Sequence, residues 1–210
     1  MREGILPAGL RGIEPPALKN ILGTFRCHFY IGAVSGFLRF VGIVNAAVWF
    51  GAAIFFAAFV LPGVFSQQMH QLFHETEANP FYSGAVAQAL FERYFALQII
   101  CGAIAIVHLV AEKLYLGRAL PRFGMGLVVT LFCLGLIGGF WLEPHMKDLR
   151  QTRYFGRTTE EKAHAQRSFA IWHGISEVVN VFVMAGLLVH LVRVTRNAAP
   201  GRYGTFYQIP

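Results

Sequence analysis

The stretch FLRFVGIVNAAVWFGAAIFFAAFVL, residues 37–61, is an almost unbroken apolar run whose one charged residue is Arg39. A helix needs about 20 apolar residues to cross the roughly 30 Å hydrocarbon core of a bilayer. Backbone polar groups in lipid must be paired within their own segment, so a helix is the conformation open to such a run. The stretch therefore predicts a transmembrane helix.

Three further runs of the same character follow, at residues 94–111, 123–142 and 169–192. The polar–apolar alternation of membrane barrel strands is absent from them. Glycine and alanine recur in the runs, and small residues let helix backbones approach closely. We therefore predict an all-α integral membrane protein, a four-transmembrane-helix bundle over residues 36–194.

The composition of the whole chain agrees with this class. Of its 210 residues 55% are hydrophobic and 14% are charged, whereas about a quarter of an average soluble domain is charged. The mean hydropathy is +0.50, and the formal charge of +7 comes from basic residues that flank apolar runs. Anionic headgroups attract such residues, so we expect the lipid bilayer, and no nucleic acid, as partner. No P-loop, dinucleotide fingerprint, nucleophile elbow or HExxH motif occurs, and we expect no enzyme.

Two segments flank the predicted bundle, residues 1–35 and residues 195–210. In the first, Pro15 and Pro16 precede an apolar stripe at helical spacing, made of Leu18, Ile21, Leu22, Phe25 and Phe29. Such a stripe beside basic residues predicts an interfacial amphipathic helix on the cytoplasmic leaflet. The second segment is predicted to be a cytoplasmic tail.

The distribution of basic residues predicts the orientation. With four spans, the N-terminal segment, the second connection and the C-terminal tail share one side and carry ten Lys and Arg residues. The other side carries six, all between Glu143 and Arg167. Because the more basic side usually faces the cytoplasm, we predict a multi-pass protein of the bacterial inner membrane with both termini cytoplasmic.

Polar residues that interrupt the runs are the candidate site residues, because ionisable groups in a bilayer are costly. All are predicted in the outer half of the membrane: Glu92, Arg93, Glu143, His173, Glu177 and Asn180. We expect Glu143, His173 and Glu177 to contact one another or Arg93. Two interpretations stay open: structural pairing between helices, and a solute, proton or metal site with His173, Glu177 and Glu143 as candidate ligands.

The sequence also predicts where the fourth helix starts. Thr158 and Glu161 fit a capping box, which predicts a helix from about Thr159.

His108 and His190 lie near the inner ends of the second and fourth runs, where two imidazoles could ligate an iron axially. Histidines at span ends more often lie at the interface, so we predict no cofactor and keep a haem b bound by these two residues as an alternative.

Two separated motifs resemble a known family. They are Trp141-Leu142-Glu143-Pro144 and, about 25 residues later, Phe169-x-x-x-His173-Gly174-x-Ser176-x-x-x-Asn180. Together they resemble the transmembrane protein 205-like family, a bacterial and eukaryotic membrane domain of unknown function. Leu61–Phe65 and Leu90–Phe95 agree with it, although Glu92-Arg93 departs from its usual proline and bulky residue. The resemblance covers residues 36–194 and implies four spans with Glu143, His173, Ser176 and Asn180 as signature polar positions.

These observations lead to one functional expectation and two alternatives. We expect a membrane protein that handles a small solute or a metal through the outer-half polar residues. The first alternative is an accessory or assembly subunit in contact with other membrane subunits or with further copies of itself. The second is a haem b membrane protein.

Overall fold

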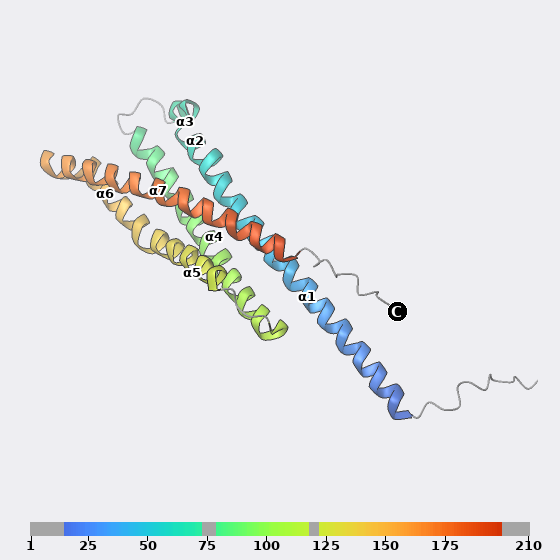
Figure 1. Cartoon of the computed structure of the whole chain (residues 1–210). Helices are drawn as coiled ribbons and strands as arrows, with labels where there is room; N and C mark the ends of the chain where they lie inside the picture. Colours follow the sequence, from blue (N-terminus) through green and yellow to red (C-terminus); the bar gives the residue numbers. More distant parts are fainter. Residues whose placement is uncertain (1–14, 73–78, 118–121, 199–210) are drawn as a thin grey trace, which may run out of the picture.

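The computed structural model describes residues 15–72, 79–117 and 122–198, and these residues form helices joined by short turns (Figure 1). In order they are α1 (Pro15–Phe55), α2 (Leu61–Val64), α3 (Gln67–Leu72), α4 (Asn79–Leu116), α5 (Arg122–Ile137), α6 (Glu143–Phe155) and α7 (Thr159–Ala198).

Four helical stretches of this part of the chain are long and apolar enough to span a membrane. They cover Val34–Val64, Phe81–Tyr115, Arg122–Phe155 and Thr159–Arg196. Each contains one of the predicted runs, so the all-α, four-span prediction is confirmed. Each helix is longer than the apolar run inside it, and the additional residues at the two ends of the runs include polar ones.

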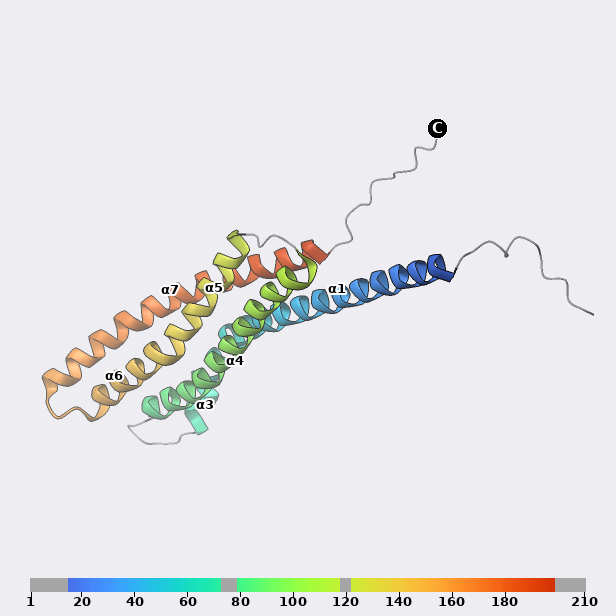
Figure 2. The same cartoon turned by 90° about the horizontal axis from the view of Figure 1, so that it is seen from below.

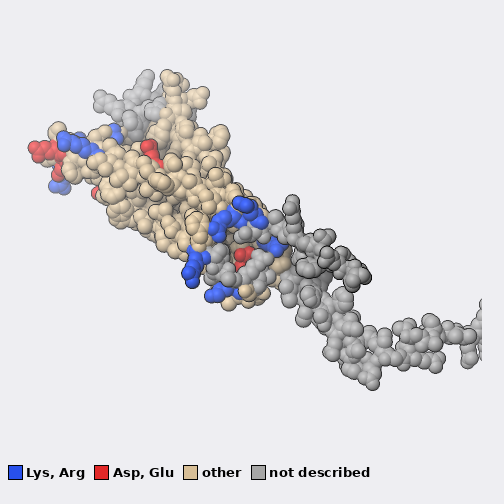
Figure 3. Space-filling model, viewed as in Figure 1, with Lys and Arg blue, Asp and Glu red and all other residues tan. Residues whose placement is uncertain are grey.

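The ends of the elongated bundle are clearly separated. The start of α1, the end of α4, the start of α5 and the end of α7 point toward one end, and α3 and the turn from α6 to α7 lie at the other (Figures 1 and 2). On the face drawn in Figure 3, Lys and Arg side chains gather toward these two ends, and the surface between them is largely uncharged. This distribution suits a protein whose middle lies in lipid.

The N-terminal amphipathic segment differs from the expectation in one respect. Helix α1 runs without a break from Pro15 to Phe55, so Leu18–Phe29 belongs to the same helix as the first span. No proline follows Pro16 until Pro62, and isolated glycines are tolerated inside a helix. The position of this segment on a bilayer stays a prediction, and residues 1–14 lie outside the described part of the chain.

Prolines occur inside two of the long helical stretches without ending them. A five-residue π-helical segment precedes each proline: Phe56–Val60 before Pro62, and Gly138–Leu142 before Pro144. Proline has no N–H to donate to the preceding turn, and a π-helical turn is one way to absorb the lost hydrogen bond. The third stretch therefore continues past Pro144. Its last part, α6, consists of residues for which the sequence predicts a connection.

The capping box at the start of α7 is confirmed. The Glu161 amide donates a hydrogen bond to Thr158 Oγ1 at 3.1 Å, and Glu161 Oε2 accepts one from the Thr158 amide at 3.3 Å. These bonds satisfy N–H groups that have no partner at a helix start.

The core lies where α1, α4, α5 and α7 cross. Trp49, Val128 and Leu187 are at most 1% exposed. Gly102 on α4 lets the helices approach there, because a Cβ atom at this position would lie 2.7 Å from Phe132. Close contact through small residues is the usual packing mode of membrane helices.

Candidate functional site

The buried face of α4 carries a line of polar side chains. Its members, here called the α4 polar line, are each at most 9% exposed: Ser83, Gln88, Tyr94, Gln98 and His108. From Ser83 to His108 a helix rises about 38 Å at 1.5 Å per residue, which exceeds the roughly 30 Å hydrocarbon core. Buried polar groups therefore occur along α4 over a length comparable to the thickness of a membrane.

In the middle of the line, hydrogen bonds join α4 to α1. Trp49 Nε1 donates to Gln98 Oε1, and Gln98 Nε2 donates to the Tyr94 hydroxyl at 2.5 Å. Asn45 Nδ2 donates to the Cys101 carbonyl at 2.9 Å. With their partners so close, these polar groups hold the two helices together in lipid.

At the end of the bundle where α4 and α7 end, the structure places His108 and His190 inside the bundle, each at most 8% exposed. His108 Nε2 lies 2.8 Å from the Leu38 carbonyl, and a Cβ atom at Gly42 would lie 2.7 Å from the His108 ring. The ring is thus held against the backbone of α1, and His190 packs edge-on to Trp49 with ring centroids 6.1 Å apart. This arrangement does not fit a porphyrin between the two imidazoles, because the His108 nitrogen that would bind iron contacts α1.

At the opposite end, distant from the end of α7, α4 and α6 share a polar group made of Ser83, Gly84, Gln88, Glu143 and Arg150. We call it the outer cluster after the orientation predicted from the sequence. Gln88 Nε2 donates to Glu143 Oε1 at 2.6 Å. The Arg150 guanidinium donates to the Gly84 carbonyl and to Gln88 Oε1, and it is close enough to Glu143 for electrostatic attraction. The cluster therefore joins a cation and an anion through an amide.

Two buried atoms of the outer cluster have no hydrogen-bond partner among the described residues. They are the hydroxyl oxygen of Ser83, a residue 1% exposed, and Nε of Arg150. The Arg150 side chain lies against Gly84, the residue after Ser83 in the chain, where a Cβ atom would be 3.1 Å from Arg150 Cδ. Buried polar atoms normally have a partner, so this end of the bundle has hydrogen-bonding capacity left over.

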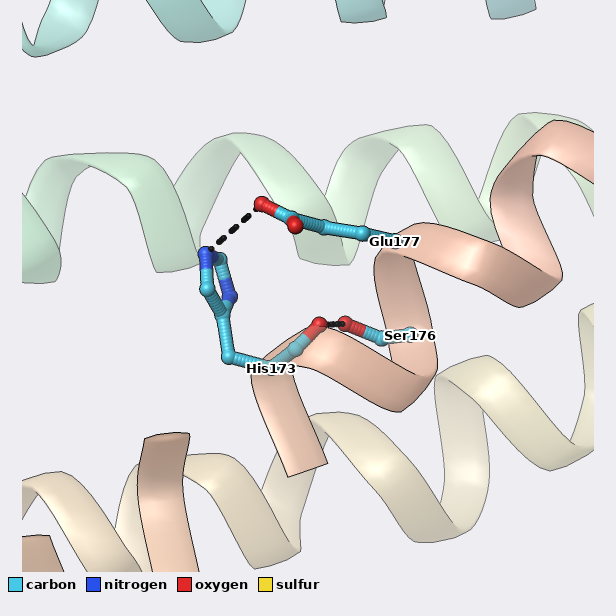
Figure 4. A network of polar contacts seen from close by, with 3 residues as sticks. All are labelled: His173, Ser176 and Glu177. Atoms are coloured by element: carbon cyan, nitrogen blue, oxygen red, sulfur yellow. Dashed lines mark hydrogen bonds and ion pairs between the residues drawn. The ribbon is translucent and has the colours of Figure 1, made fainter. Parts of the chain in front are cut away.

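The predicted contact among Glu143, His173, Glu177 and Arg93 is only partly present. His173 Nε2 lies 3.2 Å from Glu177 Oε1, and their side chains are 53% and 69% exposed (Figure 4). Glu143 instead accepts a hydrogen bond from Gln88 and lies near enough to Arg150 for electrostatic attraction, and Arg93 makes no ion pair within the described residues. Of the contacts expected among these residues, the one between His173 and Glu177 is present, whereas Glu143 lies with Gln88 and with Arg150, two turns further along α6.

The remaining predicted residues do not join the outer cluster. Glu92 and Arg93 are exposed on α4, Asn180 is half-buried on α7, and Ser176 Oγ donates to the His173 carbonyl of its own helix at 2.7 Å. No group of three or more His, Cys, Asp or Glu residues in the described ranges could hold a metal ion. His173, Glu177 and Glu143 are thus not gathered into such a group in the described ranges.

Sequence reasoning missed Ser83, Gln88 and Arg150. The first two precede the apolar run at Tyr94, in residues expected to lie outside the membrane. Arg150 follows Glu143 by seven residues, the spacing of two helical turns on one face. That spacing is the signal in the sequence, and it places Arg150 beside Glu143 only because the helix continues beyond Pro144.

The comparisons with known proteins place the chain in a family. No curated protein matches it, and no solved structure does. Residues 44–154, more than half of the chain, match a family described as a domain of unknown function, DUF4149. The match includes Gln88, Glu143 and Arg150 but ends before α7, so it does not test the second motif of the transmembrane protein 205-like resemblance. The four membrane-spanning helices and this match together show that the chain is a multi-pass integral membrane protein of the DUF4149 family.

Proposed function

We propose that the protein binds a small polar solute at the outer cluster and lets it cross the membrane along the α4 polar line. The observation that carries this proposal is the pair of buried atoms without a partner, Ser83 Oγ and Arg150 Nε. Leaving a polar atom buried and unpaired costs about 1–3 kcal/mol. A bound solute or its water would remove that penalty.

The donors define the chemistry of the solute. Arg150 Nε carries a hydrogen and can only donate, and the Ser83 hydroxyl can donate as well as accept. The solute must therefore present an acceptor oxygen, as a polyol, an amide or a carboxylic acid does. Glu143 offsets the charge of Arg150, so the cluster has no net charge to balance and can bind a neutral solute.

The location of the cluster follows from the charge distribution. Ten basic residues on the side of the termini against six on the other side favour cytoplasmic termini. We therefore propose the bacterial inner membrane as the location and an outer cluster near the periplasmic surface. The motifs at Trp141–Pro144 and Phe169–Asn180 support a relationship to the transmembrane protein 205-like family.

Osmotic swelling of proteoliposomes tests the proposal, with glycerol, urea and acetic acid as probes. We expect the wild-type protein to speed entry of at least one probe over protein-free liposomes. Ser83→Ala and Gln88→Leu should lower that rate. Ser176→Ala is the matched control, because its hydroxyl already binds its own helix and its loss should leave the rate unchanged.

Two results would overturn the proposed function. One is wild-type swelling no faster than that of protein-free liposomes for all three probes. The other is an unchanged rate in Ser83→Ala, which would mean that the solute does not use the unpaired hydroxyl.

A further inference from the structure

Helix α7 is the least covered of the four spans. Only 11% of its most apolar 18-residue window is buried, compared with 22–33% for the other three. Its inner half runs beside α1, whereas its outer half runs beside α6 and diverges from α1 (Figures 1 and 2). One side of the outer half therefore has no neighbouring helix.

That side carries a contact between a histidine and a glutamate inside an apolar stretch. His173 and Glu177 stand on the same side of α7, with side chains 53% and 69% exposed (Figure 4). The neighbouring Ile175, Val178 and Val181 are large, apolar and 46–59% exposed, as residues facing lipid are. Ionisable groups at such a depth usually face protein or water, because exposure to lipid is costly.

Small residues lie next to this pair. Ala170 and Gly174, four residues apart, are exposed and half-exposed, and a Cβ atom added at Gly174 would have nothing within 4 Å. We call Ala170, His173, Gly174, Glu177 and Val181 the α7 face. Small residues at this spacing allow another helix to approach closely.

We propose that a second copy of this chain docks on the α7 face. The charge of the face favours this occupant, because one surface carries both a carboxylate and an imidazole. The His173–Glu177 contact uses one ring nitrogen and one carboxylate oxygen, which leaves one of each for a partner. In two copies inserted in the same direction, His173 of each lies about 6 Å in depth from Glu177 of the other, within reach of the two side chains. A two-fold axis makes the two pairings equivalent.

Disulfide crosslinking in native membranes tests the docking. Cys27, Cys101 and Cys133 are first replaced by alanine, and a single cysteine is then introduced as Ala170→Cys or Ile175→Cys. These two positions point about 140° apart around a helix of 3.6 residues per turn, and both are exposed. We expect oxidation to yield several times more dimer from Ala170→Cys than from Ile175→Cys.

Charge variants in the Ala170→Cys background test the reciprocal pairing. His173→Glu brings four carboxylates together and should abolish the dimer band. Adding Glu177→His to that variant restores one group of each kind and should restore the band. Step counting of fluorescently labelled wild-type protein in vesicles, which needs no cysteine replacement, should give two steps per particle.

Three outcomes would overturn the inference. They are equal crosslinking at the two positions, a crosslinked product whose mass differs from two copies of this chain, and single-step bleaching of the labelled wild type. The second would identify a different membrane protein as the occupant. None of them bears on solute entry at Ser83, so the proposed function is tested separately.

Discussion

Gln98 is the residue whose replacement tests most directly how polar groups hold this bundle together. It lies on α4, is 6% exposed, accepts a hydrogen bond from Trp49 Nε1 and donates one to the Tyr94 hydroxyl. Gln98→Leu introduces an apolar side chain of similar size and leaves the buried indole N–H and the phenol without this partner. The variant should therefore fold but unfold more easily.

The magnitude follows from two lost bonds. Hydrogen bonds between membrane helices contribute on average about 0.6 kcal/mol and at most about 1.7 kcal/mol each, and an orphaned buried donor adds a penalty of about 1–3 kcal/mol in soluble proteins. We expect Gln98→Leu to lower the free energy of unfolding by about 1–3 kcal/mol. Combining it with Trp49→Phe, which removes the orphaned donor, should cost less than the sum of the two single changes by about 1 kcal/mol.

The assay is unfolding by SDS in mixed micelles, followed by circular dichroism, for the wild type, both single variants and the double variant. Gln166→Leu is a control, because Gln166 is exposed on α7 and its replacement should change little. Strict additivity of the two single changes would refute the reasoning, since it would mean that Trp49 and Gln98 contribute independently.

Three further predictions concern close packing, topology and cofactor content. Gly42→Ala should push His108 away from α1 and destabilise the protein by about 1–3 kcal/mol in the same assay, whereas Gly51→Ala, with nothing within 4 Å of its Cβ position, should not; equal effects would contradict the packing described at Gly42. A reporter fused after Pro210 should be active in the cytoplasm and not in the periplasm, and the opposite pattern would reverse the orientation. The purified protein should show no Soret band, because His108 Nε2 contacts the Leu38 carbonyl; a band that disappears in His108→Ala or His190→Ala would establish haem binding.

The sequence by itself determined the number and position of the spans, because the length and apolarity of a run decide whether it can span a bilayer. It also determined the start of α7, since the Thr158–Glu161 capping box is local and needs no tertiary contact. It also indicated Glu143 as a candidate site residue, because placing an ionisable side chain in lipid costs free energy. Each of these predictions depends on residues close together in the chain.

Only the tertiary structure decided which polar groups meet. The partners of Glu143 are Gln88, 55 residues earlier in the chain, and Arg150, which α6 brings beside it after Pro144. In a soluble helix the apolar stripe marks the packing face, but in lipid both the packed and the exposed faces are apolar, so the period of the sequence does not show which side is buried. His108 and Gln98 on the inside and His173 and Glu177 on the outside therefore look alike in the sequence. Their surroundings differ only because the crossing of α1, α4 and α7 covers one pair and leaves the other uncovered.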